Sequence, residues 1–155
     1  MKPFPHQYRV RASGDATGDV ALKADRLPDL YSEPPAEFGG PDARWSPEML
    51  LIAAVADCLI LTFRAIARAS KLSWTSLDCD VTGTLDRVDG TTQFTHFDVR
   101  ARLVVPATEN PQKARDALDT AERNCLISRS LTGSSHLDAV VETVLPAELP
   151  AVSVN

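Results

Sequence analysis

Three cysteines carry most of the reactive chemistry that this sequence offers, and two of them have informative surroundings. Cys58 lies inside a long apolar segment, and Cys125 lies between the polar residues 121–124 and the segment 126–128. A thiolate that is oxidised to a sulfenic acid can condense with a second thiol to form a disulfide. Cys58 and Cys125 are therefore a possible attacking and resolving pair, provided that the fold brings them together.

Core packing is the alternative interpretation of each thiol, because free cysteine is among the most buried residue types. We adopt it for Cys79, which alternates with Leu77 and Val81 on the inward face of a predicted strand. Cys125 is expected where a helix ends, and the negative end of the helix dipole disfavours a thiolate there. Cys125 therefore suits a resolving role better than an initial attack.

Asp57 precedes Cys58 within the apolar segment. A carboxylate in such surroundings needs a partner or a solvated site. Asp57 therefore indicates a cavity or an interface beside this part of the helix, or else an ion pair with Arg64.

Composition limits the classes of function. A length of 155 residues corresponds to one domain, residues 1–155, and the net charge of −5 with dispersed basic residues argues against nucleic-acid binding. The scattered histidines and cysteines match no metal signature, so we expect no metal site. No apolar leader is visible at the start of the sequence, so we expect a cytoplasmic location. Disulfides in the reducing cytoplasm are usually transient and serve catalysis or redox sensing.

Hydrophobic periodicity predicts an α+β fold with a mainly antiparallel sheet and a long, buried central helix. Ser46 is expected to cap a helix over residues 47–69, with Pro47 at its first position. Asp57 and Arg64 interrupt this helix, so we interpret it as a core helix and expect no membrane association. A second helix is predicted over residues 109–123, and Asp89 with Gly90 predicts a hairpin. Strands are predicted over residues 7–12, 20–22, 27–31, 77–83, 94–105 and 137–145.

Three segments resemble the OsmC/Ohr family of osmotically inducible and organic hydroperoxide resistance proteins. They are Glu37-Phe38-Gly39-Gly40-Pro41, the segment from Ser46-Pro47-Glu48-Met49 to Cys58, and Ala121-Glu122-Arg123-Asn124-Cys125-Leu126-Ile127-Ser128-Arg129-Ser130-Leu131. In order and spacing the resemblance extends from about Tyr8 to Val144. The chain is similar to a divergent member of this family.

The resemblance implies an OsmC-like fold in which two chains intertwine as a homodimer. It also implies thiol-dependent reduction of small organic hydroperoxides to alcohols. The resulting disulfide would be reduced again by a dithiol such as a lipoylated protein or thioredoxin, with no bound cofactor. Antioxidant and stress-response roles follow from the same resemblance.

The resemblance assigns the peroxidatic role to Cys58, the resolving role to Cys125, and the role of holding an activating arginine to Glu48. Apolar walls from Met49, Leu50 and Ile127 would suit an organic hydroperoxide.

The chain departs from the family pattern because it has no arginine at either position where the family places its activating arginine. Ala16 stands near its place in one branch of the family, and Phe38 or Gly39 in the other. Arg44, four residues before Glu48, is the nearest substitute, and its alternative is an exposed loop charge.

The main hypothesis is therefore a cysteine-based peroxidase that passes through a Cys58 sulfenic acid and a Cys58–Cys125 disulfide. Two alternatives are a non-catalytic dimer that binds a small apolar ligand and a thiol redox sensor.

Overall fold

The computed structural model describes residues 3–145, and the chain folds as two compact units, Met1–Leu51 and Ile52–Asn155. That the units together make up one domain stays a prediction. The predicted irregular tail after Pro146 lies outside the described residues.

The first unit contains a small antiparallel sheet in the order β1-β2-β3. Its strands are β1 (Arg11–Ser13), β2 (Val20–Lys23) and β3 (Leu30–Ser32), and a short 3-10 turn, η1 (Ala36–Phe38), follows them. The half-buried strand expected over residues 7–12 is wrong in its extent and burial, because the ladder begins only at Arg11 and Tyr8 is 91% exposed. The alternation of residue types in this segment predicted one buried face, but residues 7–13 are all exposed.

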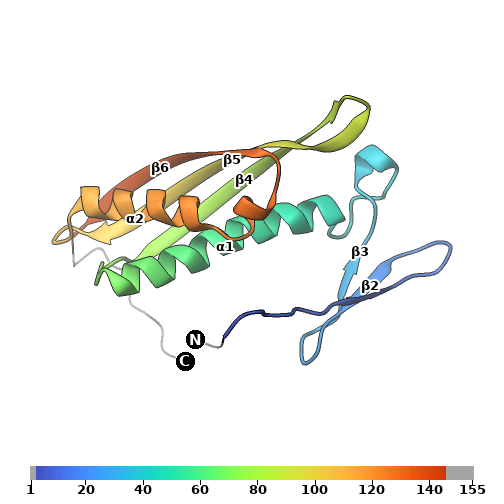
Figure 1. Cartoon of the computed structure of the whole chain (residues 1–155), viewed down its shortest axis with the longest axis horizontal. Helices are drawn as coiled ribbons and strands as arrows, with labels where there is room; N and C mark the ends of the chain where they lie inside the picture. Colours follow the sequence, from blue (N-terminus) through green and yellow to red (C-terminus); the bar gives the residue numbers. More distant parts are fainter. Residues whose placement is uncertain (1–2, 146–155) are drawn as a thin grey trace. The chain divides into compact units, whose positions relative to one another are not determined.

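The second unit is a three-stranded sheet in the order β4-β5-β6 with helices along one face (Figure 1). The strands are β4 (Ser76–Val88), β5 (Thr91–Pro106) and β6 (Ser134–Val144). The helices are α1 (Pro47–Ala69), which begins in the first unit, and α2 (Pro111–Asn124). A second 3-10 turn, η2 (Ser128–Ser130), follows α2.

The sheet of the second unit is mixed. β4 pairs with β5 in antiparallel register through the predicted hairpin, where Asp89 and Gly90 both adopt the left-handed backbone that a tight two-residue turn requires. β6 instead pairs with β5 in parallel, and α2 is the crossover between them. The expectation of a mainly antiparallel sheet therefore holds except at this pair.

Local signals place both helices close to the predicted bounds. The Ser46 hydroxyl accepts the Met49 N–H at 3.2 Å, as expected for the cap of α1. The Asn110 side chain caps α2 by accepting the Gln112 and Lys113 N–H groups, so α2 begins two residues later than predicted.

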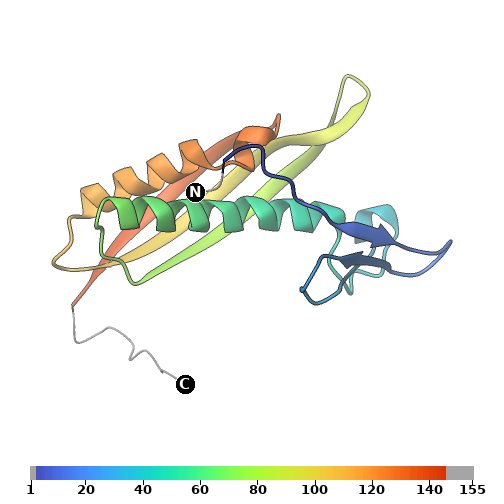
Figure 2. The ribbon, with the colours of Figure 1, turned by 60° about the horizontal axis from the view of Figure 1, so that its bottom comes forward.

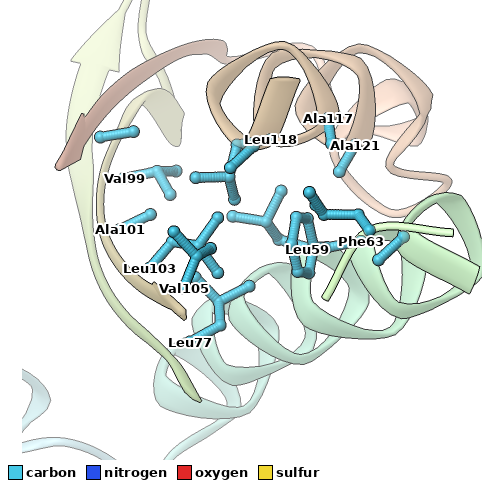
Figure 3. Close-up of a cluster of buried hydrophobic side chains, with 14 of the residues drawn as sticks. Leu59, Phe63, Leu77, Val99, Ala101, Leu103, Val105, Ala117, Leu118 and Ala121 are labelled. Atoms are coloured by element: carbon cyan, nitrogen blue, oxygen red, sulfur yellow. The ribbon is translucent and has the colours of Figure 1, made fainter. Parts of the chain in front are cut away.

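The hydrophobic core lies between the helices and the sheet of the second unit (Figure 3). α1 contributes residues one turn apart, which places them on one face of the helix. The fully buried side chains of α1 are Val55, Leu59, Phe63 and Ala67. They meet α2 residues such as Leu118 and β5 residues such as Leu103.

The expectation of a long, buried central helix holds along one stripe of α1, and its burial on the other faces stays a prediction. One stripe of the helix is buried, while Leu61 on another face is 50% exposed. Figure 2 shows α1 running beside α2 with its other side uncovered within this unit. The apolar composition predicted burial correctly along the stripe facing the sheet, but within residues 52–145 no helix or strand covers the opposite face of α1.

We expect Leu118→Ala to lower the free energy of unfolding by about 2–5 kcal/mol, because its fully buried side chain leaves a cavity between α2 and the sheet. Urea unfolding measures this. The matched control Val140→Ala, at a position 53% exposed on β6, should change stability by less than about 0.5 kcal/mol. Equal losses in the two variants would contradict the described core.

Candidate functional site

Cys58 of α1 and Cys125, the residue that ends α2, hydrogen-bond each other through their thiols. Cys58 is half-buried, whereas Cys125 is only 1% exposed. α2 ends at Asn124, so Cys125 lies at the helix end as the sequence indicated. The fold therefore brings together the two thiols that we paired from the sequence, and both are free thiols.

The environment of Cys58 favours its thiolate. Burial opposes ionisation, but the Ile127 backbone N–H, the Cys125 thiol, the Thr62 hydroxyl and the Leu126 backbone N–H together outweigh it and lower the pKa of Cys58. The Thr62 hydroxyl lies 3.9 Å from the Cys58 sulfur, one helical turn further along α1. These groups are uncharged donors, and such donors stabilise an anion where water is scarce.

Cys125 has the opposite tendency. Burial is the main cause that raises its pKa, and the neighbouring Cys58 raises it further. The Ser128 hydroxyl donates to the Cys125 sulfur at 3.2 Å and, together with the Ser128 backbone N–H, partly offsets the effect. Of this thiol pair, Cys58 therefore ionises first, while Cys125 stays protonated as its hydrogen-bond donor.

The turn after α2 holds these groups in place. The Arg129 N–H donates to the Cys125 carbonyl at 3.1 Å, and the Ser130 N–H donates to the Ile127 carbonyl at 2.9 Å. This folding turns the N–H groups of Leu126 and Ile127 toward Cys58. Ile127, predicted as an apolar wall, is half-buried against the core and contributes its backbone to the site.

Cys79 is a core residue, as its strand pattern indicated. It pairs with Ala101 across β4 and β5 and packs against the hydrophobic core. Burial, with smaller contributions from Asp80 and Cys125, raises the pKa of Cys79 to about 11. This thiol is therefore protonated at neutral pH.

Asp57 is exposed on α1, and none of the ion pairs among residues 3–145 joins it to Arg64. The pairing that we considered from the sequence is therefore not formed.

Arg44 belongs to the first unit, and its guanidinium has partners there. Its Nε lies 2.5 Å from an Asp19 carboxylate oxygen, and its Cζ lies 5.6 Å from the centre of the Tyr31 ring. These contacts favour the alternative of a loop charge, and the activating role of Arg44 stays a prediction.

Glu48 lies in the first turn of α1, and its Oε2 is buried without a hydrogen-bond partner among the described residues. Met49 beside it is exposed and Leu50 is half-buried. These three residues belong to the first unit, and their roles toward Cys58 stay predictions.

Sequence reasoning missed three contributors to the site. Thr62 had a detectable signal, because a hydroxyl four residues after a helical cysteine shares its face. Ser128 had a weaker one, since a hydroxyl three residues after Cys125 can reach back across a turn. The backbone N–H groups of Leu126 and Ile127 have no signal in the residue types.

Within residues 3–145, no group of three or more His, Cys, Asp or Glu side chains is arranged to hold a metal ion.

The α+β fold and the thiol pair define a class of protein, and the comparisons identify it. The family model described as OsmC-like protein matches residues 39–139, so the chain belongs to the OsmC-like family. An uncharacterized protein, YmaD of Bacillus subtilis, is 26% identical over 117 residues, which cover 74% of this chain and 78% of that protein.

Solved structures share the fold. An OsmC-like protein of unknown function from Vibrio cholerae has a TM-score of 0.81 at 18% identity, covering 88% of this chain and 100% of that one. Organic hydroperoxide resistance proteins from Elizabethkingia anophelis and Legionella pneumophila have TM-scores of 0.70 and 0.69 at 17% and 22% identity. They cover 91% and 90% of this chain and all of their own. At these identities the likeness establishes the fold, and the family includes hydroperoxide-resistance proteins.

We expect Thr62→Val to raise the pKa of Cys58 and to slow its alkylation by iodoacetamide at pH 7 about two- to tenfold, because the thiolate loses a hydroxyl donor. Alkylation rates measured from pH 5 to pH 10 by mass spectrometry give the pKa. In the wild type the rate should rise below the ordinary thiol range and then level off, and Cys79 should stay unmodified at pH 7.

Thr62→Ser should keep the wild-type profile, since it retains the hydroxyl, and the exposed Thr92→Val is the matched control. A Cys58 profile that is identical in Thr62→Val and the wild type would contradict this description of the site.

Proposed function

We propose that this protein is a thiol peroxidase that reduces small organic hydroperoxides to alcohols. The observation that carries the proposal is the hydrogen-bonded pair of Cys58 and Cys125, in which one thiol has a lowered pKa and its neighbour a raised one. The presence of hydroperoxide-resistance proteins in the same structural family supports it.

The reaction balances with these two thiols. The Cys58 thiolate attacks the peroxide oxygen distal to the organic group, the O–O bond breaks, and the leaving alkoxide takes a proton to become an alcohol. Cys58 is then a sulfenic acid. The Cys125 thiol attacks its sulfur, which releases water and leaves a Cys58–Cys125 disulfide. A dithiol such as a lipoylated protein or thioredoxin donates two electrons and two protons to restore both thiols.

Hydrogen-bond donors of the site can stabilise the Cys58 thiolate. The Leu126 and Ile127 N–H groups and the Thr62 hydroxyl stabilise the attacking thiolate. Activation in this scheme does not require Arg44. Glu48, Met49, Leu50 and Ile127 remain proposed members of the wider site, and the reducing cytoplasm is its proposed location.

A second copy of the chain is proposed to cover the outer face of α1. One described helix, α1, is long and apolar enough by length and composition to cross a membrane, and only 17% of its most apolar stretch is buried in the single chain. Asp57 lies exposed near its middle, and a carboxylate at the centre of a bilayer costs about 2.5–3.5 kcal/mol. An apolar face interrupted by a charge suits a protein partner better than lipid, which supports a homodimer.

A non-catalytic binding protein is the second candidate. One observation favours it: a hollow of about 730 Å³ in the first unit, with mainly apolar walls that include Val10, Leu27 and Tyr31. In a binding protein or a slow redox sensor, the thiols could be oxidised once, but hydroperoxide would not be turned over repeatedly. Turnover therefore separates the peroxidase from both alternatives.

Cumene hydroperoxide added to the reduced protein should consume two thiols per chain and form the Cys58–Cys125 disulfide, and dihydrolipoamide should sustain turnover. Thiol titration and peptide mapping measure the first step, and alcohol formation measures the second. Cys58→Ser should abolish consumption, because the attacking sulfur is lost. Cys125→Ser should allow one oxidation and accumulate a sulfenic acid that dimedone traps.

Cys79→Ser is the matched control and should leave turnover unchanged, because its thiol is protonated and packed in the core. Turnover that survives Cys58→Ser would exclude the proposed chemistry.

The wild type should sediment with twice the monomer mass, whereas Leu61→Glu should shift it toward monomer by placing a charge on the uncovered face of α1. Analytical ultracentrifugation measures both. Val140→Glu, which alters an exposed apolar residue of β6, is the matched control and should remain dimeric. A monomeric wild type that partitions into lipid vesicles would contradict the proposed partner.

A further inference from the structure

A serine, a histidine and a carboxylate form a hydrogen-bonded chain on the face of the second unit's sheet that is turned away from the helices. The Ser134 hydroxyl oxygen lies 2.7 Å from His96 Nδ1, and His96 Nε2 lies 3.0 Å from Asp98 Oδ1. All three residues belong to the Ile52–Asn155 unit. A hydroxyl in contact with a base, which a third group orients from its other side, is the arrangement that activates a serine as a nucleophile.

The sheet itself sets this geometry. Ser134 is the first residue of β6 and lies directly opposite His96 in the parallel β5–β6 register. Asp98 follows His96 by two residues along β5 and therefore shares its face of the sheet. Phe97 between them is buried in the core, which places His96 and Asp98 on the opposite face. The backbone ladder thus holds the three side chains next to one another.

Gly133 allows β6 to approach β5 closely at this point. A Cβ at position 133 would lie 2.8 Å from the Phe97 ring and 3.0 Å from the Phe94 carbonyl oxygen, which is closer than such atoms normally come. The carbonyl oxygen belongs to the β5 backbone and cannot turn aside as a flexible side chain could. A side chain at position 133 would therefore push the start of β6, including Ser134, away from His96.

The hydrogen-bond roles in this chain follow from the carboxylate. Ionised Asp98 can only accept, so His96 Nε2 carries the ring hydrogen and donates it. In the neutral imidazole Nδ1 is then an acceptor, and the Ser134 O–H donates to it. The Ser134 oxygen also lies 3.5 Å from the Thr95 carbonyl oxygen, a longer contact than the one to His96. The imidazole is therefore positioned to take the hydroxyl proton.

The accessibility of this chain defines the substrates that it suits. The His96 and Asp98 side chains are 37% and 51% exposed, and Ser134 is exposed as well. Water would solvate the oxyanion of an attacked carbonyl here, so the rate gain comes from the base and from positioning. Esters with a good leaving group need the least further help. A hollow of about 290 Å³, whose walls include Asp98, Thr82 and His136, offers space for a small substrate.

We propose that Ser134 is a nucleophile that accepts acyl groups from small activated esters, with His96 as its general base and Asp98 as a positioning residue. Ser134 Oγ attacks the carbonyl carbon while His96 Nδ1 takes the hydroxyl proton, and the alcohol or phenol leaves with that proton. Water then hydrolyses the acyl-serine, which releases the carboxylic acid and restores the hydroxyl. No electrons are exchanged, so this activity is separate from the thiol chemistry and goes beyond the proposed peroxidase function.

Hydrolysis of p-nitrophenyl acetate tests the proposal. The reaction is followed in the full-length Cys58→Ser variant, because the Cys58 thiolate of the wild type would itself attack the ester. We expect release of p-nitrophenolate, together with an acetyl group that mass spectrometry locates on Ser134. In the same background, Ser134→Ala should lower the protein-dependent rate at least about tenfold, since a positioned base contributes about 10²–10⁴-fold. Ser73→Ala removes another exposed hydroxyl and is the matched control, which should leave the rate unchanged.

Two further variants separate base chemistry from a structural effect. His96→Ala should lose the same activity, and imidazole added in solution should restore part of it, because a free base can enter the space that the ring leaves. Asp98→Asn should lower the rate at least about threefold through the lost orienting hydrogen bond, while Asp98→Glu should retain more of it. Acetylation of lysines with none at Ser134, or an unchanged rate in both Ser134→Ala and His96→Ala, would overturn the proposal.

Discussion

The contact between the middle of α1 and the end of α2 is the constraint on which the candidate site depends. Both helices bury apolar stripes against the same face of one sheet, and that packing sets Cys58 beside Cys125. Neither thiol reaches the other through local structure, since 67 positions separate them in the sequence and they lie on different helices. The hydrophobic core therefore creates the reactive pair, and a loss of packing between the helices would separate the sulfurs.

The two thiols differ because their surroundings differ. Cys58 faces the N–H groups of Leu126 and Ile127 and the hydroxyl of Thr62. Cys125 is buried, and its S–H donates a hydrogen bond to the Cys58 sulfur. A stabilised thiolate next to a protonated thiol is the arrangement that stepwise oxidation and resolution require. Uncharged donors on Cys58, together with the burial of Cys125, account for this difference.

Two features of α1 are incomplete in the single chain, namely an exposed apolar face and an unpaired carboxylate oxygen. Leu61 on the outer side of α1 is half exposed, and Glu48 Oε2 in the first turn has no hydrogen-bond partner among residues 3–145. The two features call for different partners, because apolar surface is covered by more apolar surface while a buried anion needs a cation or a hydrogen bond. One helix thus carries both the core contacts of the second unit and the incomplete contacts of the first.

The sequence by itself determined both helices, the hairpin and the identity of the thiol residues, although not the extent of the first strand. Ser46 and Pro47 start α1, the Asp89-Gly90 pair turns the hairpin, and apolar periodicity defines the core stripe, because each of these signals acts over a few residues. The residue contexts of Cys58 and Cys125 made them a possible pair, and the family resemblance assigned the peroxidatic and resolving roles, which stay proposals. Strand alternation could not reveal that β6 pairs in parallel with β5, since a period of two carries no direction. Only the tertiary structure decided which backbone N–H groups face Cys58 and which carboxylate oxygen stays unpaired, because those contacts depend on how distant segments pack and not on residue type.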